Sequence, residues 1–180
     1  MARSRPRLSF ARGSPPDGSR LARLAVPASD RVRRMARLAS IWIKRAHRGP
    51  MDPADRATLV GGAGIQGNAD YGSRRHVTLL SAERWREAES ELGASVPPAA
   101  RRANLLVEGA DFKESRGRRL RIGSCRLLVQ GETRPCHRMD EAWPGLQRAL
   151  GPDWRAGAWA EIEVGGEIAV GDAVEWESEA

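Results

Sequence analysis

The distribution of turn residues between residues 101 and 180 limits the fold of this chain more than any other feature of its sequence. Apolar runs of strand length alternate there with short turns: residues 105–107 precede a Glu-Gly-Ala-Asp turn, and residues 119–122 meet Gly123-Ser124. Such runs between glycine-containing turns are typical of β-strands and hairpins. This part of the chain therefore predicts a set of short strands rather than long helices.

The C-terminal segment repeats the pattern. Residues 158–164 and 167–170 flank Gly165-Gly166, and Gly171-Asp172 precedes a last run at residues 173–176. A Gly-Gly pair between two alternating runs is a strong hairpin motif. We therefore predict a hairpin centred on Gly165-Gly166.

Strands are also predicted earlier in the chain, at residues 37–44, 58–60 and 75–80. In the first of them Ala39, Ile41 and Ile43 occupy alternate positions and form one apolar face. Residues 47–53 contain two prolines and are predicted as a turn. Four glycines in residues 61–67 lack the Lys-Ser/Thr and the spacing of a phosphate-binding loop, so we interpret them as sharp turns with positive φ.

A helix is predicted to start after Ser81, which suits an N-cap. Apolar residues recur at helical spacing up to Leu92, and Gly93 ends the helix. A second helical stretch, residues 140–150, is interrupted or begun at Pro144. Many short strands with one or two peripheral helices predict a mainly β (α+β), small β-barrel-like domain with a partly parallel or Greek-key strand order.

The charge of the chain is unevenly distributed. Residues 1–50 hold 13 basic and 2 acidic residues, a net charge of +11, whereas residues 51–180 hold 17 basic and 21 acidic residues, a net charge of −4. Residues 1–34 are rich in Arg, Ser, Pro and Gly and predict a disordered basic leader, with the domain at residues 35–180. A mildly acidic domain weakens the case for a nucleic-acid-binding protein.

The leader carries arginines but no apolar segment before a cleavage site, so we predict no secretory signal. Its composition resembles that of transit peptides, but we favour an unstructured tail or a true start at Met35. No apolar run is long enough to span a membrane, and we expect no membrane partner. We expect a cytoplasmic protein with reduced thiols.

The segment Glu-Thr-Arg-Pro-Cys-His-Arg at residues 132–138 concentrates the reactive side chains. Pro135 fixes its own φ and favours an extended residue before it, which predicts a defined loop. A thiol reacts or binds a metal as thiolate, and nearby cations favour that form. Cys136 is thus either a reactive or metal-bound sulfur or an inert core cysteine, whereas Cys125 lies in a predicted strand and is expected in the core. Two cysteines make neither a disulfide scaffold, a CxxC-type zinc site nor an iron–sulfur site.

The motifs occur in an order that resembles the MOSC domain family, named after the C-terminal part of molybdenum cofactor sulfurase, over residues 36–177. The first matching motifs are the turn Gly64-Ile65-Gln66-Gly67-Asn68 and the Arg-rich strand and helix at residues 74–92. Next comes Arg101-Arg102-Ala103-Asn104-Leu105, followed by Val107, Gly109 and Asp111. The last three are the G-x-x-L-x-I-G element at residues 117–123, the Arg-Pro-Cys loop at residues 134–136 and the Gly-Gly-x-Ile-x-x-Gly-Asp pattern at residues 165–172. Each motif is weak alone, but their number, order and spacing make the match fairly specific.

The resemblance implies a strand-rich fold and association with the molybdenum cofactor, molybdopterin. The related cysteine of the family is regarded as a sulfur carrier or a molybdenum ligand, which implies that Cys136 is the catalytic residue and the metal ligand; thiolate is a soft ligand that suits this centre. Arg101, Arg102 and Arg134 would bind the pterin phosphate or an oxo group with forked donors. Asn104 would read the pterin edge or cap a turn.

The chain departs from the family pattern at one turn. Gly-Asp followed by His becomes Gly67-Asn68-Ala69-Asp70-Tyr71, without the histidine, and with Asp70 as a candidate replacement for the acid. His76 in the next strand is expected to be a core or surface residue. His137, beside Cys136, is the candidate catalytic histidine, which could take the thiol proton or orient a substrate.

Longer family members add a pyridoxal-phosphate-dependent desulfurase half that this sequence lacks. The two lysines, Lys44 on a predicted strand and Lys113 in a polar loop, lack the apolar pocket that activates a Schiff-base lysine. The sequence therefore gives pyridoxal phosphate no support.

Three functions follow, ranked in this order. In the first, Cys136 carries a persulfide received from a separate cysteine desulfurase and delivers sulfur to molybdenum or another acceptor. In the second, Cys136 ligates molybdenum in a small reductase of N-hydroxylated compounds that needs an electron-donor protein. In the third, a non-catalytic interaction protein docks on nucleic acid or anionic surfaces through its basic leader.

Overall fold

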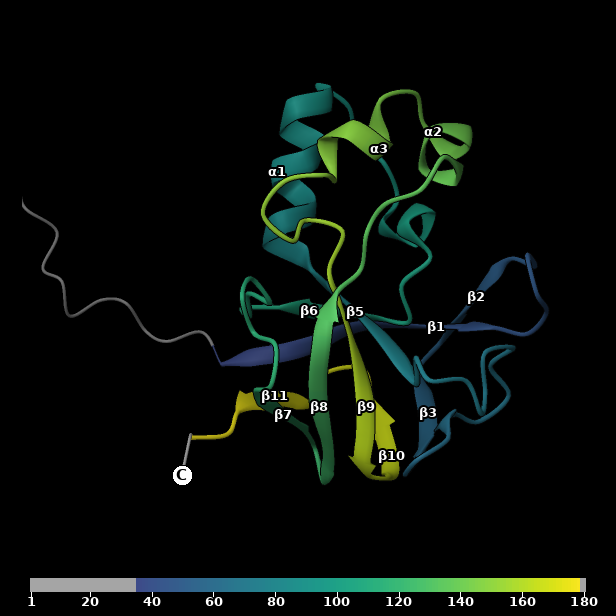
Figure 1. Ribbon diagram of the computed structural model, residues 1–180, viewed down its shortest axis with the longest axis vertical. Helices are drawn as coiled ribbons and strands as arrows, with labels where there is room; N and C mark the ends of the chain where they lie inside the picture. The colour runs from purple at the N-terminus through teal and green to yellow at the C-terminus, as the bar shows by residue number, and fades with distance from the viewer. Residues whose placement is uncertain (1–34, 179–180) are drawn as a thin grey trace, which may run out of the picture. The chain divides into compact units, whose positions relative to one another are not determined.

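The computed structural model describes residues 35–178 (Figure 1). The predicted leader, residues 1–34, and the docking function assigned to it lie outside the described residues. The strands are β1 (Ala36–Lys44), β2 (Met51–Ala54), β3 (Arg56–Val60), β4 (Gly64–Ile65), β5 (Val77–Ser81), β6 (Leu105–Glu108), β7 (Arg119–Ile122), β8 (Cys125–Glu132), β9 (Ala158–Val164), β10 (Gly166–Ala169) and β11 (Ala173–Trp176). The helices are α1 (Ala82–Leu92), the 3₁₀ helix η2 (Pro98–Arg101), α2 (Arg138–Ala142) and α3 (Leu146–Ala149).

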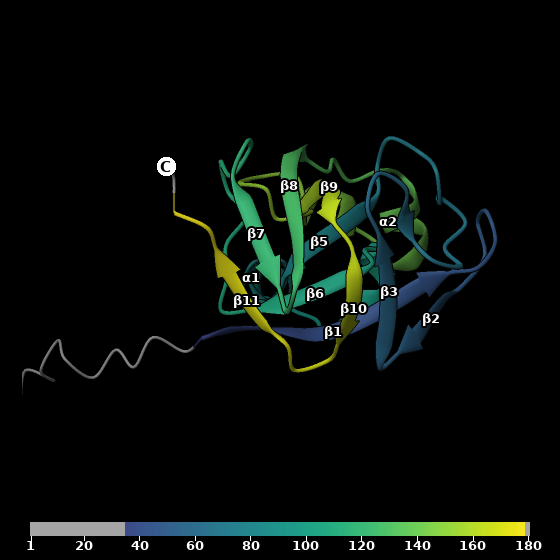
Figure 2. The same cartoon turned by 90° about the horizontal axis from the view of Figure 1, so that it is seen from below.

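Seven strands close into a barrel. The main sheet has the order β11-β7-β8-β9-β5-β6-β1-β2, and pairing of β11 with β1 joins its ends, leaving β2 outside the closed ring (Figure 2). β5 and β6 pair in parallel across the α1 connection, with Leu79 opposite Leu105, while the other described pairs are antiparallel. The prediction of a mainly β, barrel-like and partly parallel fold with few helices is confirmed.

The α1 boundaries are also confirmed. The Ser81 hydroxyl accepts a hydrogen bond from the Arg84 amide at 3.5 Å, and Gly93 ends the helix with φ +63°. The predicted second helical stretch is interrupted at Pro144, which lies between α2 and α3. No helix within residues 35–178 is long and apolar enough to cross a membrane.

The predicted apolar face of β1 is partly wrong. Ile41 and Ile43 are buried as expected, but Leu38 is fully buried and Ala39 is not. The register of β1 against β6 shifts between Leu38 and Ser40. A bulge of this kind adds one residue and exchanges the two faces of the strand, which explains the difference.

The predicted hairpin at Gly165-Gly166 is wrong. β9 pairs with β8 and β5, whereas β10 pairs with β3 in a separate three-stranded sheet, β10-β3-β4. A Cβ atom on Gly165 would lie 2.4 Å from the Leu59 carbonyl oxygen. Glycine is therefore required here because two backbones cross closely, and not because of a tight hairpin turn.

The predicted turn at residues 47–53 ends earlier than expected. Residues Met51–Ala54 form β2, which pairs antiparallel with β1. β2 lies at the edge of the main sheet, where Pro53 is tolerated because an edge strand can leave one backbone position without a donor.

The apolar residues form two cores. The barrel interior holds the larger one, which includes Leu38, Leu79, Leu105, Leu127 and the fully buried Cys125, as expected for that cysteine. The second lies between the outside of the barrel and the helices, and includes Trp85, Met139, Leu146 and Leu150. Figure 1 shows α1, α2 and α3 gathered at the end of the barrel that the chain reaches as it leaves β8.

Candidate functional site

The loop that carries Cys136 connects β8 to α2, as predicted for a defined loop. Thr133 anchors its start: the buried hydroxyl donates to the Ala156 carbonyl at 2.7 Å, and the amide donates to the Gly157 carbonyl at 2.9 Å. At the other end the Cys136 carbonyl accepts from the amide of buried Met139 at 2.8 Å. The Cys136 residue is exposed between these two anchors.

Arg101 is a buried cation beside this thiol. It is 9% exposed, and its Nε donates to the Ala156 carbonyl at 2.6 Å. Burial lowers the pKa of the Arg101 guanidinium to about 10, a Cys136 thiolate would act in the opposite direction, and the cation of Arg75 lowers this pKa further. Arg101 forms no ion pair with a carboxylate within residues 35–178. A buried guanidinium without an acidic partner favours binding of an anion beside it, and this anion could be the thiolate or a ligand.

Arg102 points elsewhere although it follows Arg101 directly. Its backbone is left-handed, with φ +63°, and its guanidinium donates to the Gly49 carbonyl at 2.7 Å. A left-handed non-glycine residue is strained, and such strain persists where the surroundings fix it. The turn at Arg102 therefore separates the two side chains: Arg101 is buried, and Arg102 lines a neighbouring cavity.

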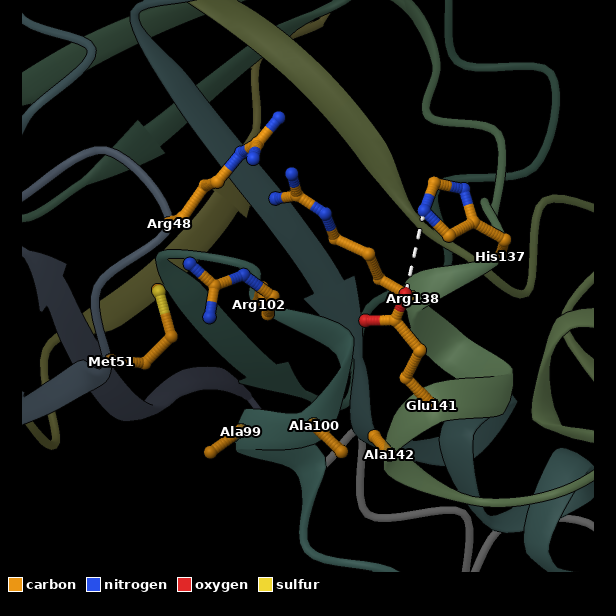
Figure 3. Close-up of a pocket in the computed structure, with 9 residues that line it drawn as sticks. All are labelled: Arg48, Met51, Ala99, Ala100, Arg102, His137, Arg138, Glu141 and Ala142. Carbon is orange, nitrogen blue, oxygen red and sulfur yellow. Dashed lines mark ion pairs between the residues drawn. The ribbon is translucent and has the colours of Figure 1, made fainter.

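Figure 3 shows this cavity, which has a volume of about 580 Å³. It is lined by Arg48, Met51, Ala99, Ala100, Arg102, His137, Arg138, Glu141 and Ala142. The three guanidinium groups form no ion pair with carboxylates of the described residues, in contrast to Arg84 on α1, which pairs with Asp111. Arg48 is left-handed as well, with φ +64°. The cavity therefore presents unpaired positive charge next to the Cys136 loop.

His137, the candidate catalytic histidine, and His76 have different surroundings. His137 lines the cavity, and its exposed ring lies 3.5 Å from the Glu141 carboxylate. His76 is half-buried and its Nδ1 accepts from the Ile162 amide at 2.9 Å, which ties β9 to the chain entering β5. Arg134 is exposed and does not line the cavity.

The side chain of Asn104 forms hydrogen bonds that connect several strands of the fold. Its side-chain oxygen accepts from the Thr78 hydroxyl at 2.9 Å, and its nitrogen donates to the Trp42 carbonyl at 3.2 Å. The same nitrogen lies 3.3 Å from Oδ1 of Asn68, which also accepts from the Lys44 amide at 2.9 Å. Asn68, at the family's acidic position, thus joins β1 to Asn104 at the start of β6, while the nearby Asp70 pairs with Lys44.

Sequence reasoning missed Arg48, Arg138 and Arg75 as site residues. Arg48 lies in a turn far from the Cys136 loop in sequence, and only the pairing of β1 with β2 brings that turn to the cavity. Arg138 is two residues from Cys136, so proximity in sequence was an available indication. Arg75 follows Arg74, and nothing in the sequence distinguishes a functional arginine in that pair.

The fold and site define a small closed-barrel protein with an exposed cysteine beside an arginine-lined cavity. The sequence profile of the MOSC domain matches residues 66–175, and the chain belongs to the MOSC domain family. No curated protein matches the sequence significantly. MOSC domains are associated with the biology of the molybdenum cofactor.

Solved structures show the same fold. YuaD from Bacillus subtilis is 22% identical with a TM-score of 0.72, and the match covers 81% of this chain and 97% of YuaD. YiiM from Geobacillus stearothermophilus is 15% identical with a TM-score of 0.64, covering 79% of this chain and 75% of YiiM. YiiM from Escherichia coli is 16% identical with a TM-score of 0.61, and the match covers 80% of this chain and 71% of that YiiM.

Proposed function

We propose that this protein carries sulfur as a persulfide on Cys136 and associates with the molybdenum cofactor. The observation that carries the proposal is the position of Cys136. It is exposed in a loop anchored at both ends, its charge interacts with that of buried Arg101, and the next residues, His137 and Arg138, line the cavity. A sulfur carrier must be reached by a donor protein, and the exposure of Cys136 meets this need. The guanidinium of Arg101 supplies a positive charge near the sulfur for an anionic donor group.

The residues present fit a molybdenum-pterin group better than a bare metal ion. Within residues 35–178 no group of three His, Cys, Asp or Glu side chains could hold a metal. A metal that arrives with sulfur ligands of its pterin needs little more than one soft protein ligand, which Cys136 would supply. Arg48, Arg102 and Arg138 would hold the phosphate through forked donors. When bound, the cofactor would supply a metal that accepts sulfur.

Sulfur loading needs a thiolate and an access route. The Cys136 thiolate attacks the outer sulfur of a donor persulfide, a new sulfur–sulfur bond forms on Cys136, and the donor leaves as a thiolate. A separate cysteine desulfurase is the expected donor. His137, whose ring is exposed and near Glu141, would accept the thiol proton before the attack.

The remaining candidate residues take supporting roles in this proposal. Asn104 has its amide nitrogen and oxygen bonded within the protein, so it would fix the wall of the site rather than read the pterin edge. Exposed Arg134 would meet an anionic group that approaches Cys136 from solvent.

Molybdenum and pterin analysis tests the cofactor association. We would express the wild type, Cys136→Ser, Arg138→Ala and the control Cys125→Ser in a host that makes the cofactor. Bound pterin that is lost in Arg138→Ala but kept in Cys125→Ser supports the assigned cavity. A metal-free wild type bearing a persulfide identifies a carrier, whereas stoichiometric molybdenum that disappears in Cys136→Ser identifies the alternative, a molybdenum-dependent reductase with an electron-donor partner. Protein without pterin, molybdenum or persulfide would contradict the proposal.

A further inference from the structure

A second cationic group lies near Cys136, outside the cavity. The guanidinium groups of Arg74 and Arg75 lie 5.8 and 5.9 Å from the ring centroid of Trp159 on β9. Both arginines are exposed, and neither forms an ion pair within the described part of the chain. A cation–π contact of this length draws a guanidinium toward the indole and leaves its N–H groups available to an oxyanion.

Arg101 connects this group to the thiol. Trp159 pairs with Gly131 near the end of β8, two residues before Thr133 begins the Cys136 loop. Arg101 and Thr133 both donate to the Ala156 carbonyl, three residues before Trp159. The charge of Arg101 also interacts with Cys136 and Arg75. Its Nε is bonded to the Ala156 carbonyl, but its two terminal nitrogens have no hydrogen-bond partner among residues 35–178. Neither Arg101 nor Arg75 lines the cavity of Arg48, Arg102 and Arg138. The Cys136 loop therefore has a second set of guanidinium donors nearby, of which the Arg101 group is nine-tenths buried.

We propose that Arg101 and Arg75, with Arg74 nearby, bind the oxyanion end of a thiosulfate or organic thiosulfonate, and that Cys136 takes the outer sulfur of this donor. The inference rests on the proposed function, because it names a substrate class for the persulfide that Cys136 carries. It adds a small-molecule route of sulfur loading to the protein donor considered above.

The reaction balances without a further reagent. The Cys136 thiolate attacks the outer sulfur of thiosulfate, and a sulfur–sulfur bond forms on the protein. The bond between the two donor sulfurs breaks, and its electron pair leaves with sulfite. The protein becomes a persulfide, and thiosulfate is converted to sulfite.

The charges explain why cations are needed at this position. An anionic thiolate and a dianionic donor repel each other, and sulfite gains negative charge as it leaves. Fixed guanidinium groups lower both barriers, most effectively where water is excluded, as around Arg101. A donor without an oxyanion, such as a polysulfide, has no sulfonate oxygens for these groups to hold and should depend less on them.

Sulfite release and intact-protein mass after addition of thiosulfate test the inference in the full-length protein. We would compare the wild type with Arg75→Ala and with the control Arg121→Ala. Arg121 is exposed on β7 opposite Arg126, near the start of β8, whereas the Cys136 loop follows the end of that strand. Polysulfide serves as the second donor for every variant.

We expect thiosulfate to add one sulfur to Cys136 and to release one equivalent of sulfite. Arg75→Ala should slow this step by about 10- to 100-fold, the usual effect of losing a hydrogen bond between charged groups. Arg121→Ala should react like the wild type, and polysulfide should load all three proteins similarly. Because Arg75 is exposed, its replacement leaves the core intact.

Three other outcomes would overturn the thiosulfate inference, the assigned oxyanion site or the persulfide function. If polysulfide loads Cys136 but thiosulfate does not, the inference is wrong and the persulfide function stands. Equal thiosulfate rates in Arg75→Ala and Arg121→Ala would remove the assigned oxyanion site. If neither of these donors nor a cysteine desulfurase with cysteine loads Cys136, the proposed function fails together with the inference.

Discussion

Arg101 and Thr133 donate hydrogen bonds to the same carbonyl oxygen, that of Ala156, at 2.6 Å from the arginine Nε and 2.7 Å from the threonine hydroxyl. Arg101 comes from η2, and Thr133 starts the loop that ends at Cys136. One acceptor in the chain before β9 therefore fixes both the buried cation and the thiol loop. The site depends on the exact path of residues 156 and 157 as much as on the reactive residues themselves.

Thr133→Val should remove one of these bonds while keeping the shape of the side chain. We expect a loss of about 1 kcal/mol in the free energy of unfolding, measured in urea, because a buried hydroxyl bond contributes about this much. Sulfur loading of Cys136 should slow as the loop loses its anchor. Thr58→Val on β3, whose hydroxyl has no hydrogen-bond partner among the described residues, is the control and should change neither quantity. An unchanged loading rate in Thr133→Val would argue against this anchor.

Gly157→Ala should be severely destabilising. Gly157 has φ +92°, and an added Cβ would lie 2.0 Å from the Leu79 carbonyl oxygen. The backbones must separate to admit it, at a cost of about 3 kcal/mol or more. Gly62→Ala is the matched control, since Gly62 also has positive φ (+73°) but open space around it, and should cost about 1 kcal/mol. Similar urea midpoints for the two variants would show that the close approach at Gly157 is absent in solution.

Asn104→Asp and Asn68→Asp should differ although both add a carboxylate. Asn104 donates to the Trp42 carbonyl, so an aspartate there would set two oxygens against each other and cost about 3 kcal/mol or more. Asn68 accepts from Lys44 and Asn104 through Oδ1, and an aspartate keeps both bonds. The new charge is buried there as well, so Asn68→Asp also destabilises, but we expect a smaller loss than for Asn104→Asp because no bond is reversed. Thermal unfolding of the two variants measures the difference, and equal losses would contradict the bonding pattern described.

Features of this fold that depend on neighbouring residues were predictable from the sequence, whereas strand pairings between distant residues were not. The α1 boundaries follow from Ser81 and Gly93, which act on adjacent backbone groups, so both were predictable. The partner of β10 was not, because Gly165-Gly166 is compatible with a hairpin and with a close backbone crossing. The choice between them depends on Leu59, which is distant in sequence.

The candidate site shows the same division. The sequence predicted Cys125 in the core and a defined loop around Cys136, but it left open whether Cys136 was a reactive or an inert core cysteine; in the structure Cys125 is buried and Cys136 is exposed. Arg101 and Arg102 are chemically identical neighbours, and their separation into a buried cation and a cavity residue arises from the left-handed turn at Arg102. That turn is held by tertiary contacts, among them the bond to Gly49, which short-range patterns do not contain.

The charge on Arg101 should persist across the neutral and moderately alkaline range. Burial places its pKa at about 10, below the ordinary value, so the unfolded state holds the proton more tightly. The buried charge therefore lowers stability at every pH below that value, and this cost decreases only as the pH rises through it. Sulfate binding to Cys136→Ser, measured by calorimetry at constant ionic strength, should stay constant from about pH 6 to about pH 9. A steep decrease within this window would show that another group supplies the charge.

The central claim is that Cys136, and not Cys125, holds the transferable sulfur. Burial raises the pKa of the Cys125 thiol, which keeps it protonated and inert inside the barrel. The most direct measurement is the intact mass, followed by peptide mapping, after treatment with a cysteine desulfurase and cysteine. One added sulfur on Cys136 in the wild type and in Cys125→Ser, with none in Cys136→Ser, is the predicted result. Sulfur on Cys125, or the same gain in Cys136→Ser as in the wild type, would contradict the account.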